Sequence, residues 1–238
     1  MQSIKSKIIW LTLFSIAMGY METAVVVYLR ELYYPNGFQF PLTIIPYKVA
    51  ATEFWREAAT IIMLAAVGIF TGKTKMQCFA FFVYCFAIWD IFYYVFLKII
   101  LDWPASLFTW DILFLIPVPW VGPVLTPCII SLTMIVFMLM IIYYSEKNIS
   151  LKRNRIEWWL FISGALIQIF SFIWDYVKYV HKMDRPFWTL SDQEALFSEI
   201  AEYVPQEYNW SLFVIGEAFV LFGIWKIYRR VTAKIIKL

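Results

Sequence analysis

Residues 77 to 98 read QCFAFFVYCFAIWDIFYYVFLK, an apolar stretch in which Asp90 is the one charged residue between Gln77 and Lys98. A helix needs about 20 mostly apolar residues to cross the hydrocarbon core of a bilayer, and this stretch has that length. Across the chain of 238 residues, 62% are apolar and 16% are charged, whereas soluble domains are about half apolar and a quarter charged. The sequence therefore predicts an integral membrane protein in contact with a lipid bilayer.

Five further stretches have the same length and character. With the first they give predicted spans at about 8–29, 49–71, 77–98, 121–143, 157–180 and 210–228. No composition shift divides the chain. We therefore expect an all-α fold, a polytopic membrane helix bundle with about six transmembrane helices that forms a single integral membrane domain over residues 1–238.

The basic residues indicate how this bundle is oriented. Six spans place both chain ends on one side, and 13 of the 20 Lys and Arg residues lie on that side, in the two ends and in the second and fourth connections. Because Lys and Arg are enriched in cytoplasmic segments, we expect both termini in the cytoplasm, in a bacterial inner membrane or a plasma membrane. The net charge of +3 is too small to indicate a nucleic-acid partner.

The connection after the third span is expected to contain a short helix. Asp102 stands where an N-cap would stand, and Pro104 lies near the first turn. At about 1.5 Å per residue, residues 105–116 are too short to cross a membrane. The prolines that break the chain after it are Pro117, Pro119, Pro123 and Pro127. We predict a re-entrant or interfacial helix over about 105–116 that carries Asp111.

A second short helix is predicted in the connection before the last span. Ser191 to Glu194 form a capping-box pattern, and apolar residues follow at helical spacing. This pattern predicts a short outer amphipathic helix over about 191–204. Its acidic polar face suits either a lid over the bundle or a solvated cap.

Acidic side chains gather in the outer half of the predicted spans. One carboxylate at a helix centre costs roughly 2.5 to 3.5 kcal/mol on insertion scales, so these groups should face one another or a polar cavity. Carboxylates that are crowded without partners take up protons or bind a cation. The candidate ligand- or ion-binding residues are Glu22, Glu53, Arg56, Glu57, Asp90, Asp111, Asp175 and Glu217, with Lys98, Lys178, His181 and Lys182 as secondary candidates.

Two local patterns refine this cluster. The spacing of Glu53, Arg56 and Glu57 brings all three to one helix face, where Arg56 can bind a carboxylate of its own or a neighbouring helix, either in a functional site or as a structural ion pair. The pattern I-W-D-x-x-x-Y-V occurs around both Asp90 and Asp175. We therefore expect these two aspartates at matching depths.

The single histidine, His181, limits the cofactors that the chain can hold. Haem and His-rich copper, zinc or di-iron sites need more imidazoles and are not expected. A hard cation such as Mg²⁺, Ca²⁺, Mn²⁺ or Na⁺ suits oxygen ligands. Its predicted ligands are Glu22, Glu57, Asp90 and Asp175.

Three functions remain open from the sequence. The first is binding or movement of cations, protons or a cationic solute, which in so small a chain implies a homo-oligomer or a partner membrane subunit. The second is a divalent-metal-dependent membrane enzyme that acts on a lipid-like substrate at the outer leaflet. The third is a non-catalytic subunit or assembly factor of a membrane complex, with its carboxylates paired across helices. No motif assigns catalytic residues, so enzymatic activity stays undecided.

Overall fold

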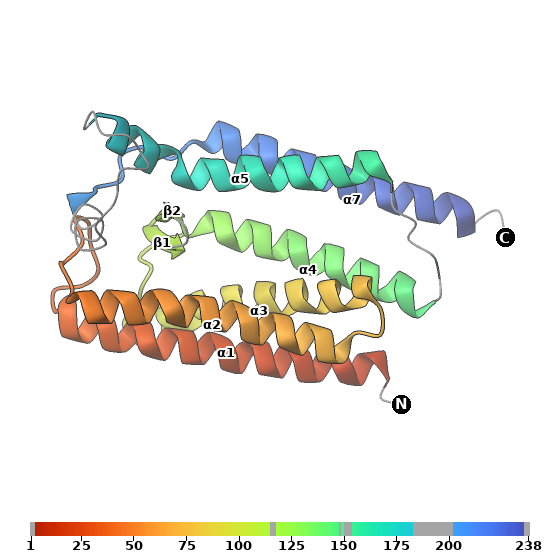
Figure 1. Cartoon of the computed structure of the whole chain (residues 1–238), viewed down its shortest axis with the longest axis horizontal. Helices are drawn as coiled ribbons and strands as arrows, with labels where there is room; N and C mark the ends of the chain where they lie inside the picture. The colour runs from red at the N-terminus through yellow and green to blue at the C-terminus, as the bar shows by residue number, and fades with distance from the viewer. Residues whose placement is uncertain (1–2, 115–117, 148, 150–153, 183–201, 236–238) are drawn as a thin grey trace.

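The computed structural model describes residues 3–114, 118–147, 149, 154–182 and 202–235. Within these residues, six helices are long and apolar enough to cross a membrane, and they lie over the six predicted spans. They are α1 (Ile4–Tyr33), α2 (Tyr47–Thr71), α3 (Lys75–Leu101), α4 (Leu125–Glu146), α5 (Arg155–Lys182) and α7 (Trp210–Ile235). Figure 1 shows the N- and C-termini at the same end of the bundle, as an even number of crossings requires. We call this the termini end.

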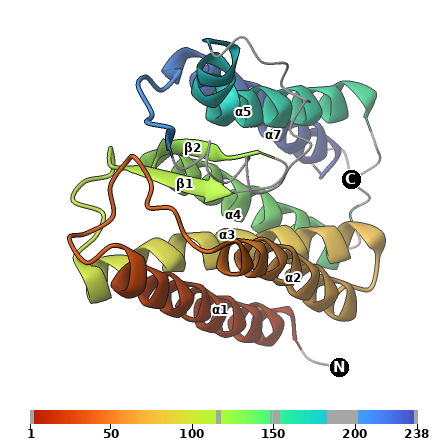
Figure 2. The same cartoon turned by 60° about the vertical axis from the view of Figure 1, so that its left-hand side comes forward.

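The helices form two groups. Helix α3 packs against α1, α2 and α4, while α5 and α7 lie side by side on the other side of α4 (Figures 1 and 2). The largest buried apolar cluster lies among α1 to α4 and includes Leu64, Phe81 and Ile142. Ile227 and Val231 of α7 join this cluster. Helix α7 therefore contacts the first group near the termini end.

Glycines bring the helices of each group close together. A Cβ atom built on Gly19 of α1 would lie 3.1 Å from the backbone oxygen of Trp89 in α3. Gly164 of α5 and Gly216 of α7 face each other: a Cβ on Gly164 would lie 2.8 Å from the Gly216 oxygen. Small residues of this kind allow the close backbone approach that drives helix association in membranes.

The predicted short helix over about 105–116 is wrong. Strands β1 (Trp110–Phe114) and β2 (Trp120–Pro123) pair there as an antiparallel hairpin, with Asp111 opposite Gly122. Asp102 is the C-cap of α3 in the left-handed conformation (φ 50°), not an N-cap. The prolines after residue 116 cannot donate helical hydrogen bonds, and the aromatic and branched residues of both strands favour extended backbone. The predicted bundle of six long helices is confirmed, with this hairpin in place of the first short helix. Helix α4 begins at Leu125 instead of 121.

We call the end of the bundle that carries this hairpin the hairpin end (Figure 1). The predicted amphipathic helix over about 191–204 falls mainly on residues 183–201, which lie outside the described residues. At its far end, Tyr203 and Val204 are described and are not helical. Its proposed action as a lid stays a prediction.

Candidate functional site

Six of the eight predicted site residues line one cavity of about 220 Å³, which we call the carboxylate cavity. Helices α1, α2 and α3, strand β1 and the connection between α1 and α2 form its wall. It lies toward the hairpin end, since β1 belongs to its lining. Its charged lining residues are Glu22, Arg30, Glu53, Arg56, Glu57, Asp90 and Asp111.

Arg56 joins two helices through an ion-pair triad in this cavity. Its Nε donates to Glu53 Oε2 at 2.9 Å, and its Nη2 donates to the other oxygen of the same carboxylate. Its Nη1 donates to Glu22 Oε2 of α1. The predicted binding of carboxylates by Arg56, on its own and a neighbouring helix, is present in the structure. A guanidinium that meets a carboxylate with two parallel bonds is strongly fixed in orientation, so this triad ties α1 to α2.

Arg30 is the one charged residue in the described lining of this cavity that the sequence did not mark as a site candidate. Its guanidinium lies 3.9 Å from the ring of Trp103 and 4.5 Å from that of Phe38, and its Nη2 lies 3.8 Å from Asp111 Oδ1. The Tyr94 hydroxyl donates to the other Asp111 oxygen at 3.1 Å. The three partners of Arg30 come from separate parts of the chain, so no local spacing could have predicted them.

Asp111, on β1, is buried, and the pKa of its carboxyl is raised. Burial raises the pKa of the Asp111 carboxyl to about 6, although Arg30 and the Tyr94 hydroxyl oppose this shift. The cause is the loss of hydration, which disfavours the charged form more than one guanidinium at 3.8 Å favours it. Asp111 can therefore exchange a proton near neutral pH.

Asp90 lies at the boundary between two cavities. Together with Trp89 and Leu113 it lines both the carboxylate cavity and a larger one. Its Oδ2 accepts a hydrogen bond from the Ser131 hydroxyl of α4 at 2.8 Å. It forms no ion pair with any described basic residue.

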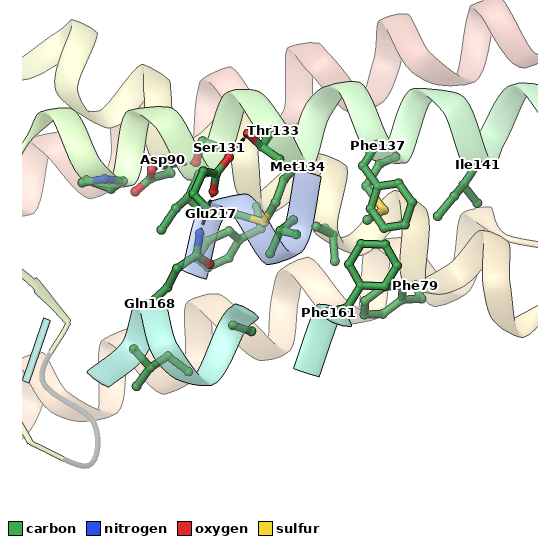
Figure 3. A pocket seen from close by; sticks show the side chains of 18 of the residues that line it. Phe79, Asp90, Ser131, Thr133, Met134, Phe137, Ile141, Phe161, Gln168 and Glu217 are labelled. Atoms are coloured by element: carbon green, nitrogen blue, oxygen red, sulfur yellow. Dashed lines mark hydrogen bonds between the residues drawn. The ribbon is translucent and has the colours of Figure 1, made fainter. Parts of the chain in front are cut away.

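The larger cavity, about 590 Å³, lies between α3 and α4 on one side and α5 and α7 on the other, and we call it the central cavity. Its wall is mostly apolar and includes stacked rings of Phe137 and Phe161, whose centroids are 4.7 Å apart. Figure 3 shows the polar side chains gathered at one part of this cavity and the phenylalanines at another. The polar group consists of Asp90, Ser131, Thr133, Gln168 and Glu217.

Glu217 joins three helices within this cavity. The Thr133 hydroxyl of α4 donates to its Oε1 at 2.5 Å, and the Gln168 amide of α5 donates to its Oε2 at 2.6 Å. The sequence predicted Glu217 as a site residue but missed both partners, because they carry no charge. A single glutamine in the apolar fifth span was the available signal for Gln168.

The lining of the central cavity continues to Glu157 and Arg230. Arg230 of α7 donates from Nε and Nη2 to the two oxygens of Glu157 of α5, at 2.8 and 2.7 Å. Glu157 is the first residue of the fifth predicted span, and our grouping of acidic residues in the outer half left it out. Both residues lie toward the termini end, since α5 begins and α7 ends there.

Two indole groups in the wall of the central cavity lack a hydrogen-bond acceptor. The Nε1 atoms of Trp89 and Trp120 are buried and have no partner among the described residues. Buried donors without an acceptor are rare in native proteins.

Asp175 does not share a site with Asp90, despite the shared sequence pattern. It accepts hydrogen bonds from the Tyr203 hydroxyl at 2.7 Å and from the backbone N–H groups of Gln206 and Glu207 at 3.0 and 3.4 Å. Asp175 therefore fastens the segment before α7 to α5. Asp90 and Asp175 therefore have different hydrogen-bond partners. Their matching depth in the membrane stays a prediction.

Three of the four predicted metal ligands line one cavity, and the fourth does not. Glu22, Glu57 and Asp90 line the carboxylate cavity, while Asp175 lies outside its lining. Among the described residues, no group of three or more His, Cys, Asp or Glu side chains is arranged to hold a metal ion.

Three of the four secondary candidates, Lys98, Lys178 and His181, are exposed. Lys98 pairs with exposed Asp102 at 2.7 Å, Lys178 lies over the ring of Trp174, and His181 is exposed. The side chain of Lys182 lies outside the described residues. Neither cavity includes Lys98, Lys178 or His181 in its described lining.

Six apolar helices that enclose two cavities with ionisable walls define a multi-pass membrane protein. No protein-family model matches the chain, and neither does any curated protein or solved structure. The functional proposal therefore rests on the geometry of the site.

Proposed function

We propose that this protein binds a cation, a proton or a cationic solute in the carboxylate cavity and moves it by way of Asp90 into the central cavity. The observation that carries the proposal is that Asp90 lines both cavities. A carboxylate in that position can exchange a cation or a proton with either side. Ionisable residues within membrane-spanning helices commonly mark ion pathways or proton relays.

The charge of the carboxylate cavity supports a cation. Five carboxylates and two guanidiniums line it, which leaves three negative charges when all are ionised. Arg56 is held by Glu22 and Glu53, and Arg30 is paired with Asp111. Neither guanidinium pairs with Asp90, so the field at this cavity attracts positive charge.

The ion pairs between arginines and carboxylates also support a second candidate function. Glu22, Glu53, Asp111 and Glu157 each have an arginine partner from the described residues. Such pairs would also fix helix packing in a non-catalytic subunit of a membrane complex. The two candidate functions differ in the role they give to Asp90. Its partner is the Ser131 hydroxyl and not an arginine.

Flux measurements on Asp90→Asn separate the two candidates. The purified protein is reconstituted into liposomes that contain a pH-sensitive dye, and proton uptake is driven by a potassium diffusion potential. A parallel assay follows radioactive Na⁺. We expect wild-type flux of at least one of these cations and a loss of ten-fold or more in Asp90→Asn, because the amide neither binds nor releases a proton and attracts cations less.

The matched control is Asp102→Asn, which makes the same chemical change at an exposed aspartate outside both cavities. Thermal unfolding in detergent confirms that all three proteins are folded. Flux in Asp102→Asn should equal that of the wild type. Equal flux in the wild type and folded Asp90→Asn would contradict the proposal and favour the subunit. The absence of proton and sodium flux in the wild type would contradict the movement of these two ions.

A further inference from the structure

The central cavity has the size and lining of a small-molecule site. Its volume of about 590 Å³ falls within the range of about 300 to 1,000 Å³ that is typical of ligand pockets. Such pockets are mostly apolar and contain a few polar groups that orient the ligand. Figure 3 shows a similar division, with Asp90, Glu217 and their donors in one part and phenylalanines in another.

The charged residues that line the central cavity determine the sign of the charge on its ligand. Three carboxylates, of Asp90, Glu157 and Glu217, face one guanidinium, that of Arg230. Arg230 is already bound to both oxygens of Glu157. An anionic group would therefore meet no available guanidinium among the described lining residues, whereas a cationic group would meet Asp90 and Glu217.

The Glu217 carboxylate has acceptor positions left for a cation. Glu217 accepts one bond at each oxygen, from Thr133 and Gln168, and an ionised carboxylate has about four acceptor positions. Trp89 and Trp120 line the same cavity, and indole rings are the strongest aromatic partners of a cation.

The apolar part of the cavity determines the rest of the ligand. Phe79, Phe137, Phe161 and Ile141 lie apart from Asp90 and Glu217 in Figure 3. Water in a cavity needs two to four polar partners, which this part of the wall does not offer. An apolar body would fill it and remain within contact distance of aromatic rings.

We infer that the central cavity binds an amphiphilic cation, with its positive group between Asp90 and Glu217 and its apolar body among Phe79, Phe137 and Phe161. The inference rests on the proposed function, because it takes Asp90 as the group that meets the substrate. It narrows the substrate class from any cation to organic cations with a large apolar surface.

Equilibrium binding of tetraphenylphosphonium tests this inference. The probe has a permanent positive charge and four phenyl rings, and tetraphenylborate has the same shape with a negative charge. Both are measured by dialysis against the full-length protein in nanodiscs of phosphatidylcholine, with empty nanodiscs subtracted. We expect saturable binding of the cation near one per chain and at least ten-fold weaker binding of tetraphenylborate to the protein.

Variants then locate the site. Asp90→Asn and Glu217→Gln should each weaken tetraphenylphosphonium binding ten-fold or more, since each removes one negative charge at the polar part of the cavity. Ala165→Trp should also abolish binding by filling the cavity, because Ala165 lines it and is exposed there. Asp102→Asn, outside the cavity, should bind as the wild type does. Because Ala165→Trp leaves every carboxylate in place, it tests the site even if Glu217→Gln fails to fold.

Several results would overturn the inference. These are no saturable binding of tetraphenylphosphonium, binding that folded Asp90→Asn, Glu217→Gln and Ala165→Trp leave unchanged, or equally tight binding of tetraphenylborate at the same site. The two proposals fail separately. Proton or sodium flux that depends on Asp90 without binding of the organic cation would remove only the inference. Binding that depends on the carboxylates without either flux would remove only the proposed ion movement.

Discussion

Asp111 illustrates how burial acts on a paired carboxylate. The side chain has an arginine and a tyrosine hydroxyl as partners, yet the pKa of its carboxyl is raised from 3.8 to about 6. The folded protein therefore holds this proton more tightly than the unfolded chain does. Between about pH 4 and pH 6 the native state binds more protons than the unfolded state, so the contribution of Asp111 to stability falls as the pH rises.

We expect Asp111→Asn to remove this part of the pH dependence. One pKa unit corresponds to about 1.4 kcal/mol, so the wild type should lose roughly 3 kcal/mol relative to the variant between pH 4 and pH 7. Thermal unfolding of both proteins in detergent at pH 4, 5, 6 and 7 measures the difference. Parallel profiles of wild type and variant would show that Asp111 does not titrate in this range.

Asp102 provides a control, because the pKa of its carboxyl is shifted in the opposite direction. Lys98 lowers the pKa of this exposed carboxyl through a hydrogen bond and its charge. Its small contribution is therefore present above its unfolded pKa and is lost as the pH falls. Asp102→Asn should not reproduce the profile of Asp111→Asn.

Asp90 and Asp175 show that a shared sequence pattern does not ensure a shared role. Both lie in I-W-D-x-x-x-Y-V, and both follow a tryptophan in an apolar helix. Asp90 meets a serine between two cavities, whereas Asp175 meets a tyrosine and two backbone N–H groups. The difference comes from the neighbouring elements, which the pattern does not contain.

Among the helices, α5 and α7 are held together by close backbone contact. A Cβ on Gly164 would lie 2.7 Å from Val220 Cγ2 and 2.8 Å from the Gly216 oxygen, closer than real Cβ contacts. A shift of α5 or α7 away from this contact would disturb the hydrogen bond between Gln168 and Glu217, which lies one turn further along α5. The glycine contact therefore supports both the packing and the polar part of the central cavity.

We expect Gly164→Ala to destabilise the protein by about 1–3 kcal/mol, the usual cost of overpacking. Gly223→Ala is the matched control on α7, because its Cβ would meet only the ring of Phe161, at 3.0 Å, and a ring can shift. Both changes carry the same gain of about 1 kcal/mol in helix propensity, so their difference isolates the backbone contact. Unfolding in mixed detergent measures the difference in stability between the two variants. Equal stability would mean that α5 and α7 move apart to accept the methyl group at no measurable cost.

The complete bundle places both termini at one end and the hairpin with the carboxylate cavity toward the other (Figure 1). The distribution of Lys and Arg predicts that the termini end faces the cytoplasm. In that orientation the carboxylate cavity lies toward the outer side, where it can take up a cation from outside.

Fusions at the C-terminus test this orientation in bacteria. Green fluorescent protein placed after Leu238 should fluoresce, because it folds in the cytoplasm, and alkaline phosphatase at the same point should be inactive. Alkaline phosphatase inserted after Gly37, between α1 and α2, should be active. The reverse pattern of activities would invert the membrane orientation and place the carboxylate cavity toward the cytoplasm.

The six apolar segments and the even number of crossings follow from local composition, since a bilayer selects long apolar helices whatever they pack against. The same reasoning grouped the intramembrane carboxylates because isolated charges are costly there, and most of them line one of the two cavities. It failed for residues 105–116, where prolines beyond the segment and pairing with β2 made a hairpin. It also could not separate Asp175 from Asp90, or find Arg30, Thr133 and Gln168. Those assignments depend on which helices face each other, and that is set by packing contacts between residues far apart in the chain.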